Sequence, residues 1–152
     1  MEKMKNLYVD GSVNPDTGNV GWGYVLLNGD KLVHTDCGQL TKDTAKEVRQ
    51  ISGELASTLY GIMFHFSKYP NEPLNIFYDY NGIYFWVCDI FSNGKAWNRN
   101  KVATRFYRKR MEEIFRTNDP KLVTFIKVKS HSGVKWNEHV DQLAKKGCGI
   151  EI

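Results

Sequence analysis

Alternating and continuous hydrophobic positions predict five strands along the chain. They are residues 4–12 (MKNLYVDGS), 20–28 (VGWGYVLLN), 31–40 (KLVHTDCGQL), 74–80 (LNIFYDY) and 121–129 (KLVTFIKVK). Within the first strand, Leu7 and Val9 share one face. The second and third strands are joined by NGD, which is typical of a hairpin turn. The fourth strand is a nearly continuous apolar run, so we expect it to be buried on both faces of the sheet.

Apolar residues at steps of three and four predict helices between and after the later strands. The longest covers about residues 45–67 and stops at YPNEP, because proline cannot continue a helix. Residues 101–116 and 135–147 are also expected to be helical, with Gly147 as the C-cap, and residues 82–91 form a short helix or turn. This order of elements indicates one α/β domain over residues 1–152, with a mixed sheet flanked by helices.

Composition agrees with a folded globular domain. The chain has 152 residues, of which 41% are hydrophobic and 13% aromatic. No apolar run approaches the roughly 18 residues of a membrane span, and MEKMKN is not followed by the apolar segment of a signal peptide. The three cysteines, Cys37, Cys88 and Cys148, have no zinc-site spacing and are odd in number. We therefore expect neither a membrane partner nor a disulfide framework, and a reducing cytoplasm as the location.

Positive charge is concentrated in one segment. The formal net charge is only +4, yet residues 95–110 (KAWNRNKVATRFYRKR) hold seven cations and no acid. Trp97, Phe106 and Tyr107 are interleaved with these cations, a combination that can grip phosphates and sugars. The same pattern is equally typical of a helix with a solvated basic face, so the segment alone leaves both interpretations open.

Four acidic residues stand at the borders of apolar segments. Asp10 ends the first strand, just after Val9, and Asp79 ends the fourth. Glu54 and Asp141 lie within predicted helices, each beside an apolar residue. Acids in such places need a cation, and no buried lysine or arginine is evident in the pattern. An all-oxygen ligand set favours Mg²⁺ or Mn²⁺ over zinc. Taken singly, each acid is as typical of a turn or a solvated helix border.

Several motifs together resemble a type-1 ribonuclease H domain. They are YVDGSVNPDTGNVGWGYVL, ISGELAS, IFYDY and VKSHSGVKWNEHVDQLAKK, which occur in this order from about Leu7 to Gly147. Each is weak alone, but the set at compatible spacing is specific. The chain is most similar to the bacterial group that resembles the ribonuclease H half of viroplasmin-like proteins. The N-terminal hybrid-binding module of that group is not expected here, because no spare length precedes Leu7.

The resemblance implies the fold and the reaction. It implies an RNase H-like fold, with a five-stranded mixed sheet in the order 3-2-1-4-5 whose second strand is antiparallel to the rest. It also implies a monomeric endonuclease that cuts the RNA strand of an RNA–DNA hybrid and leaves 5′-phosphate and 3′-hydroxyl ends. Two Mg²⁺ ions, or two Mn²⁺ ions in their place, would lie about 4 Å from each other and bind the scissile phosphate between them.

The resemblance also assigns residues to roles. Asp10, Glu54, Asp79 and Asp141 match the four metal-binding carboxylates, with Asp10 bridging both ions. Asp79 and Glu54 would hold the ion on the leaving-group side, and Asp141 the ion on the nucleophile side. His131, in a small-residue loop, would move a proton near neutral pH.

A separate group of residues is expected to select the substrate. By the same resemblance, the positions that would contact the hybrid are Gly11, Asn14, Gln50, Asn81 and Trp97. The first four would read the minor groove and its 2′-hydroxyls, while the basic segment around Trp97 would hold the DNA strand.

The chain departs from the family pattern at positions that concern grip on the substrate. Gln50 replaces a more usual Asn, Glu47 stands where some relatives have a phosphate-binding Arg, and Ser130 replaces a Gly before the loop histidine. The segment from Gly82 to Lys101 is short for a full basic protrusion. None of these departures touches the four acids.

Three other functions remain open from the sequence. A non-catalytic nucleic-acid-binding module of this fold would be expected to have lost one or more acids, and all four are present. A transposase, integrase, resolvase or proofreading exonuclease shares the fold but not the DGS, SGE and HSG contexts. A carbohydrate-acting enzyme would use an acid pair with aromatic residues along a cleft.

Overall fold

The computed structural model describes residues 4–40, 49–78, 102–128 and 135–150, with backbone only for 49–52 and 102–108. Its strands are β1 Lys5–Val13, β2 Val20–Asn28, β3 Lys31–Leu40, β4 Leu74–Tyr78 and β5 Val123–Lys127. They form one sheet in the order β3-β2-β1-β4-β5. β2 runs antiparallel to β1 and β3, whereas β1, β4 and β5 are parallel to one another. The predicted topology is confirmed.

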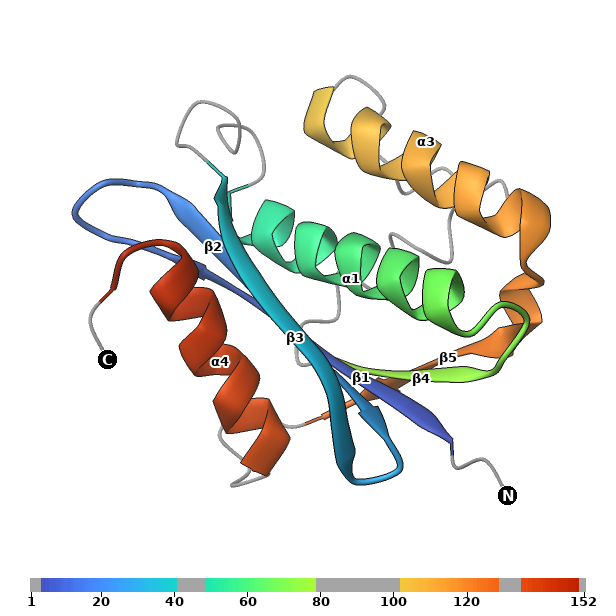
Figure 1. Cartoon of the computed structure of the whole chain (residues 1–152). Coiled ribbons are helices and arrows are strands. Elements are labelled where there is room, and N and C mark those ends of the chain that lie inside the picture. The colour runs from blue at the N-terminus through green and yellow to red at the C-terminus, as the bar shows by residue number, and fades with distance from the viewer. Residues whose placement is uncertain (1–3, 41–48, 79–101, 129–134, 151–152) are drawn as a thin grey trace.

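The helices lie on both faces of this sheet. They are α1 Arg49–Lys68, α3 Val102–Thr117, the 3₁₀ turn η1 Pro120–Leu122 and α4 Lys135–Gly147. α1 and α3 cover one face, and α4 alone lies on the other (Figure 1). The predicted helix at 45–67 is confirmed from Arg49 onward, whereas its first residues and the predicted short helix at 82–91 lie outside the described residues. No helix in the described ranges is long and apolar enough to span a membrane.

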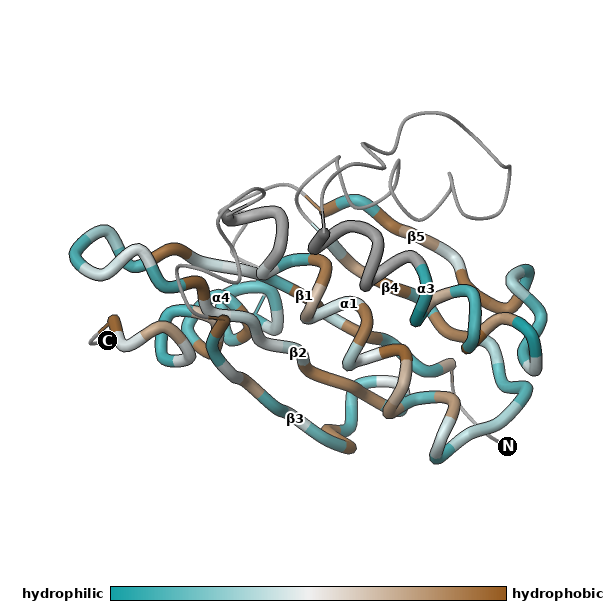
Figure 2. Tube along the Cα trace, turned by 90° about the horizontal axis from the view of Figure 1, so that it is seen from above, coloured by the Kyte–Doolittle hydropathy of each residue, from teal (hydrophilic) through white to brown (hydrophobic). Residues whose placement is uncertain are grey.

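Two apolar cores result from this arrangement. The larger core lies between the sheet and α1, and it includes Leu7, Leu26, Leu59 and Ile76, all fully buried. Figure 2 shows that the strands of the sheet and α1 are largely hydrophobic where they meet. The smaller core lies under α4 and contains Val140. Burial of side chains on both faces holds β1 and β2 at the centre of the domain.

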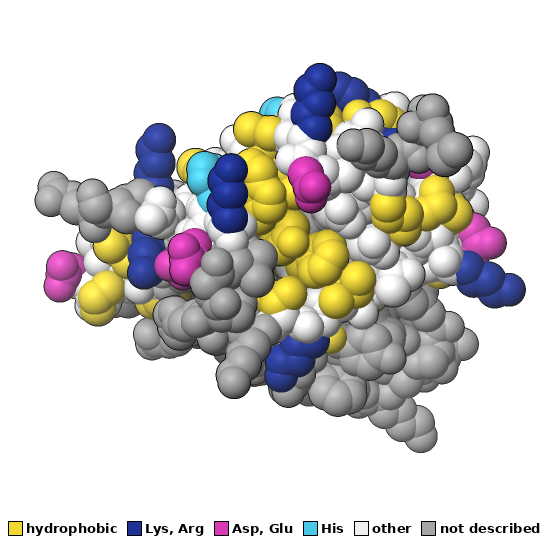
Figure 3. Space-filling view, turned by 90° about the horizontal axis from the view of Figure 1, so that it is seen from below, with side chains coloured by type: hydrophobic (Ala, Val, Ile, Leu, Met, Phe, Trp, Pro, Cys, Tyr) yellow, Lys and Arg dark blue, Asp and Glu magenta, His cyan; other side chains and the backbone are white. Residues whose placement is uncertain are grey.

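The β4–β5 half of the sheet is less covered on the α4 side. α4 packs on β2, β1 and β3, and its principal contacts do not extend to β4. Phe77 of β4 is therefore only half-buried on this face, where its ring stacks on that of Tyr8 at 4.6 Å between centroids. Seen from this side, apolar side chains gather across the middle of the surface (Figure 3). The expectation that this strand is buried on both faces is wrong, because one helix cannot cover five strands.

Two other expectations are corrected at the ends of elements. β1 does not end at Asp10 but continues to Val13, since β2 pairs with it along this whole length. Gly147 is the last residue of α4 and not its cap; the left-handed residue is Gly149, with φ of 83°. Gly147 is instead constrained by packing, because a Cβ there would collide with the backbone of Gly38 on β3.

One lysine is buried, contrary to the interpretation of the sequence. Lys5 is 2% exposed, and its Nζ lies 3.6 Å from Glu72 Oε1 and 4.5 Å from the centre of the Tyr69 ring. Lys5 begins β1, and Glu72 lies just before β4, which pairs with β1 at this end. This cation therefore meets an acid outside the set of four identified from the sequence.

Candidate active site

Asp10 projects from β1 toward the face of the sheet that α4 covers. Side chains alternate along a strand, so Val9 faces α1 while Tyr8 and Asp10 face the other way. The packing agrees, because Val9 belongs to the core under α1 and Tyr8 packs against the smaller core under α4. Asp10 is 6% exposed, and its Oδ1 accepts a hydrogen bond of 2.9 Å from the Gly11 N–H. The described pairing of β1 with β4 stops at Tyr8, so Asp10 lies just beyond it.

Glu54 approaches the same part of β1 from α1. A Cβ on Gly11 would lie 2.7 Å from Glu54 N, and a Cβ on Gly53 would lie 2.6 Å from Gly21 O. No other residue type fits in so little space, so glycine at both positions lets the helix backbone touch the strands. Glu54 is 2% exposed, although a charged side chain is rarely buried so fully. The close approach places the Glu54 backbone beside the residue that follows Asp10.

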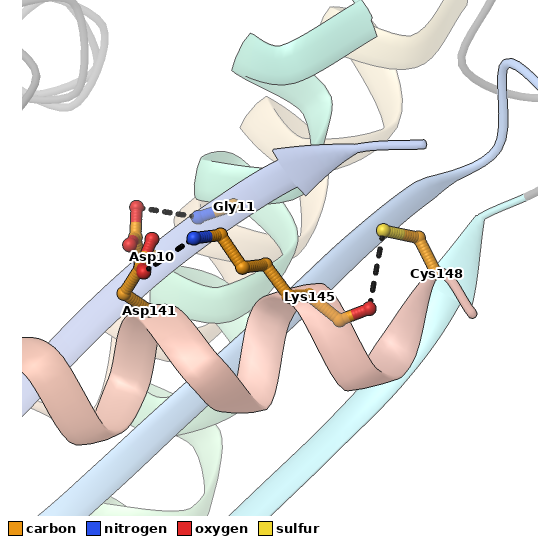
Figure 4. Close-up of polar contacts among 5 residues, drawn as sticks. All are labelled: Asp10, Gly11, Asp141, Lys145 and Cys148. Carbon is orange, nitrogen blue, oxygen red and sulfur yellow. Dashed lines mark hydrogen bonds and ion pairs between the residues drawn. The ribbon is translucent and has the colours of Figure 1, made fainter. Parts of the chain in front are cut away.

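Asp141 comes from α4 on the opposite face. The helix begins at Lys135 and presents Val140 and Ala144 to the sheet, so Asp141 stands at the edge of its buried stripe. Figure 4 shows the carboxylates of Asp10 and Asp141 directed toward one another from β1 and α4. The contact between these two elements agrees with that view. Two acids that are distant in the sequence are thus brought together by packing of α4 on β1.

Lys145 is a residue of this site that the sequence analysis missed. Its Nζ lies 3.1 Å from Asp141 Oδ2, one helical turn along α4. Both side chains are partly exposed, with 42% of Lys145 and 36% of Asp141 accessible. The spacing of four residues between an acid and a lysine on a predicted helix was a signal that could have found the pair.

Asn14 has its polar atoms engaged within the protein. Its Nδ2 donates to Cys148 O at 2.9 Å, and its Oδ1 accepts from Asp16 N at 2.9 Å. The side chain is nearly buried and joins the β1–β2 turn to the end of α4. In this arrangement Asn14 fixes the position of the turn relative to the last helix.

Several expected site residues lie outside the described residues. They are Asp79, Asn81, Trp97 and His131, together with the departures at Glu47 and Ser130. Gln50 is in the first turn of α1, one turn before Glu54, but its side chain is not among those described. Asp79 directly follows Tyr78, the last residue of β4, in the sequence.

The described donors are chemically suited to a hard divalent ion. Asp10, Glu54 and Asp141 provide only carboxylate oxygens, and the first two are almost excluded from water. Within the described ranges, no group of three His, Cys, Asp or Glu side chains is arranged closely enough to hold a metal ion. The opposed carboxylates of Asp10 and Asp141 nevertheless form a place where a cation would relieve repulsion between like charges.

Comparisons with known proteins point to one family. A curated ribonuclease H from Syntrophomonas wolfei is 28% identical over 144 residues, covering 91% of this chain and 92% of the relative. One from Chlorobium luteolum is 27% identical and covers 96% of both chains.

Solved structures share the fold at lower sequence identity. RNase H1 from the halophilic archaeon Halobacterium salinarum superposes with a TM-score of 0.67 at 18% identity, covering 95% of this chain and 96% of that one. LC11-RNase H1, solved in complex with an RNA/DNA hybrid, gives a TM-score of 0.67 at 14% identity, covering 93% and 97%. A model of the RNase H family matches residues 2–149. The chain therefore belongs to the RNase H family.

Proposed function

We propose that this protein is an endoribonuclease that hydrolyses the RNA strand of RNA–DNA hybrids with the help of two divalent metal ions. The observation that carries the proposal is the meeting of Asp10 and Asp141 from opposite ends of the sequence, with Glu54 packed beside Gly11. Two comparisons support the proposal: the match to the RNase H family over residues 2–149, and the similarity in fold to an RNase H1 solved in complex with an RNA/DNA hybrid.

The proposed roles of the acids are those that the resemblance to ribonuclease H implies. Asp10 lies between the elements that carry Glu54 and Asp141, so it is the residue suited to serve both ions. Glu54 and Asp79 would hold the ion on the leaving-group side, and Asp141 the other. When bound, Mg²⁺ or Mn²⁺ would supply an activated water and charge stabilisation at the scissile phosphate. His131 would move a proton between the phosphate and solvent.

Binding of the hybrid is proposed to use the residues next to these acids. Gly11 follows Asp10 and Gln50 is one turn of α1 before Glu54, and both are proposed to meet a minor groove that lies over the acids. Asn81 and Trp97 complete the proposed set. Asn14 would act by holding the β1–β2 turn, since both ends of its amide are already bonded within the protein.

We also propose that the protein works as a monomer in the cytoplasm. The two described cysteines, Cys37 and Cys148, are both free thiols, which suits a reducing compartment. Sedimentation of the purified protein would test the first part, with a dimer as the contrary result.

A cleavage assay on four labelled substrates tests the activity. These are an RNA–DNA hybrid, single-stranded RNA, an RNA duplex and a DNA duplex, each in Mg²⁺, Mn²⁺ and EDTA. The proposal expects cleavage only of the RNA in the hybrid, loss of cleavage in EDTA, and product ends that ligate as 5′-phosphate and 3′-hydroxyl. The matched variant is Asp79→Asn, which should abolish the reaction.

Other outcomes would replace the proposal. Hybrid binding without cleavage in either metal would indicate a non-catalytic nucleic-acid-binding module. Cleavage of the DNA duplex would indicate another metal-dependent nuclease of this fold. Normal cleavage by the Asp79→Asn variant would show that Asp79 does not hold a catalytic ion.

A further inference from the structure

Among the described residues, Lys145 is the cationic side chain that contacts Asp141. Its Nζ is 3.1 Å from Asp141 Oδ2, which is hydrogen-bonding distance for an ammonium and a carboxylate. In Figure 4 the Lys145 side chain runs back along α4 toward Asp141 and the end of Asp10. The ammonium therefore contacts the oxygen that a divalent ion on this side would use.

We propose that Lys145 is a positioning residue that holds Asp141 when no divalent ion is bound and thereby weakens binding of the ion on the Asp141 side. This inference rests on the proposed function, because it concerns the same pair of carboxylates. The new element is the role of Lys145. Because of this lysine, the ion on the Asp141 side would bind weakly to the free protein and more tightly once substrate is bound.

The physical reason is competition for one oxygen. A divalent ion that binds Asp141 Oδ2 must either displace the ammonium or share the oxygen with it at short range. The first outcome loses the ion pair, and the second brings two positive charges within a few ångströms of each other, where they repel. Either way the free protein binds the ion less tightly than it would without Lys145.

A nucleic-acid phosphate would remove this competition. The Lys145 side chain is 42% accessible and has a long flexible stem, so its ammonium can leave Asp141 for a phosphate oxygen nearby. Asp141 would then be available to the ion. By linkage, anything that draws Lys145 away from Asp141 strengthens ion binding, and ion binding strengthens the interaction with the phosphate to the same degree.

A purely structural role for the pair makes a different prediction. Acid–lysine pairs at this spacing stabilise helices by a few tenths of a kcal/mol, and such a pair would affect the stability of α4 but not ion affinity. The next residue offers a matched control, because Lys146 is an exposed lysine on the same turn, and among the described residues it is Lys145 and not Lys146 that pairs with Asp141. Replacing either lysine changes the net charge equally.

The experiment is titration of the free protein with Mn²⁺, followed by electron paramagnetic resonance, without nucleic acid and at low salt. Lys145→Met should bind Mn²⁺ about two- to fivefold more tightly than the wild type, as expected for loss of one partly exposed ion pair. Lys146→Met should match the wild type, and Lys145→Arg should retain the weaker binding. The difference for Lys145→Met should shrink as salt is raised.

Equal or weaker Mn²⁺ binding by Lys145→Met than by the wild type would overturn this inference, as would an identical gain in Lys146→Met. The variant Asp10→Asn separates failure of the proposed metal site from failure of the proposed role of Lys145. If Asp10→Asn binds Mn²⁺ as well as the wild type, or if the wild type binds none at millimolar concentration, the proposed metal site itself is wrong. If Asp10→Asn loses binding while Lys145→Met is unchanged, only the role of Lys145 is wrong.

Discussion

Asp10 illustrates at the scale of a single residue how this site opposes stability. Its carboxylate is nearly buried and directed toward that of Asp141, so two negative charges are held together by packing. Such repulsion is tolerated at functional sites, where a bound cation offsets it. Neutralising the Asp10 carboxylate would therefore stabilise the metal-free protein and impair its function.

Asp10→Asn should therefore raise stability and abolish activity together. Asn keeps the oxygen that accepts from Gly11 N, so the local hydrogen bond survives while the charge is lost. We expect the free energy of unfolding in EDTA to rise by about 0.5–1 kcal/mol, measured by urea denaturation. Cleavage of the hybrid in Mg²⁺ should fall by about 100-fold or more. A less stable variant, or one with normal cleavage, would contradict the role of Asp10.

His65 is a buried histidine that the proposed reaction does not use. It is fully buried in α1, and its Nε2 donates to Glu72 O at 2.9 Å. Burial lowers the pKa of His65 below 6.5, and the nearby Lys5 ammonium lowers it further. The unfolded chain therefore takes up this proton more readily than the folded one, so the contribution of His65 is complete above pH 6.5 and is lost as the pH falls below it.

The free energy of unfolding should accordingly fall between pH 6.5 and pH 5.5, by at most about 1.4 kcal/mol from this residue. Urea denaturation at the two pH values measures the fall. His65→Gln, although less stable overall, should show a smaller fall than the wild type. An equal fall in His65→Gln and the wild type would exclude His65 as its source.

At the scale of elements, the position of α1 depends on glycine. A Cβ on Gly53 would meet the backbone of Gly21 at 2.6 Å and that of Gly11 at 3.2 Å, and backbone atoms cannot move aside cheaply. A Cβ on Gly61, two turns further along α1, would meet only the side-chain tip of Leu7, at 2.7 Å. Both substitutions would gain the same helix propensity, so their difference isolates the contact with the strands.

Gly53→Ala should lower the free energy of unfolding by about 1–3 kcal/mol, and it should also lower cleavage because Glu54 moves away from β1. Gly61→Ala should cost less and leave cleavage nearly normal, since Leu7 can change rotamer. Urea denaturation and the hybrid assay measure both effects. The same loss of activity in the two variants would argue against a special approach of α1 to β1 at Gly53.

The sequence predicted elements better than contacts between them. The last helix was predicted from 135 to 147 and runs over these residues, because its apolar stripe marks it, although Gly147 is not its cap. The hairpin at NGD was confirmed, with Gly29 at a φ of 62° where the turn requires it.

Features that arise between distant segments were not predictable in this way. The touching of Gly53 and Gly11 depends on how a helix crosses a strand, and the half-covered face of β4 depends on where α4 stops. The burial of Lys5 likewise depends on Glu72 and Tyr69 arriving from another part of the chain. Of the candidate site, motif order identified Asp10, Glu54 and Asp141, but not the lysine that contacts one of them.

At the scale of the whole molecule, binding of divalent ions should stabilise the fold. The acids proposed to hold the ions come from β1, α1 and α4, so the proposed site would be complete only when the sheet and both helix layers are assembled. A ligand that binds only the folded state shifts unfolding by mass action, by about 2.7 kcal/mol at a concentration 100 times its Kd.

The melting temperature should therefore rise with Mn²⁺ concentration and return to its starting value on addition of EDTA. Differential scanning calorimetry of the wild type and of Asp10→Asn measures this directly. The rise should be much smaller in Asp10→Asn, although that variant starts from a higher melting temperature. An equal rise in both proteins would show that Mn²⁺ stabilises the fold from somewhere else.

The joining of Asp10 to Asp141 through the packing of α4 on β1 has a consequence for synthesis. A ribosome makes the chain from its N-terminus, so β1 emerges long before α4 does. A growing chain can pair its first strands while Asp141 is still to be translated or is held in the exit tunnel. If the proposed activity is right, a growing chain whose last helix is still inside the ribosome lacks Asp141 at the site and is inert, even when its first strands have already paired.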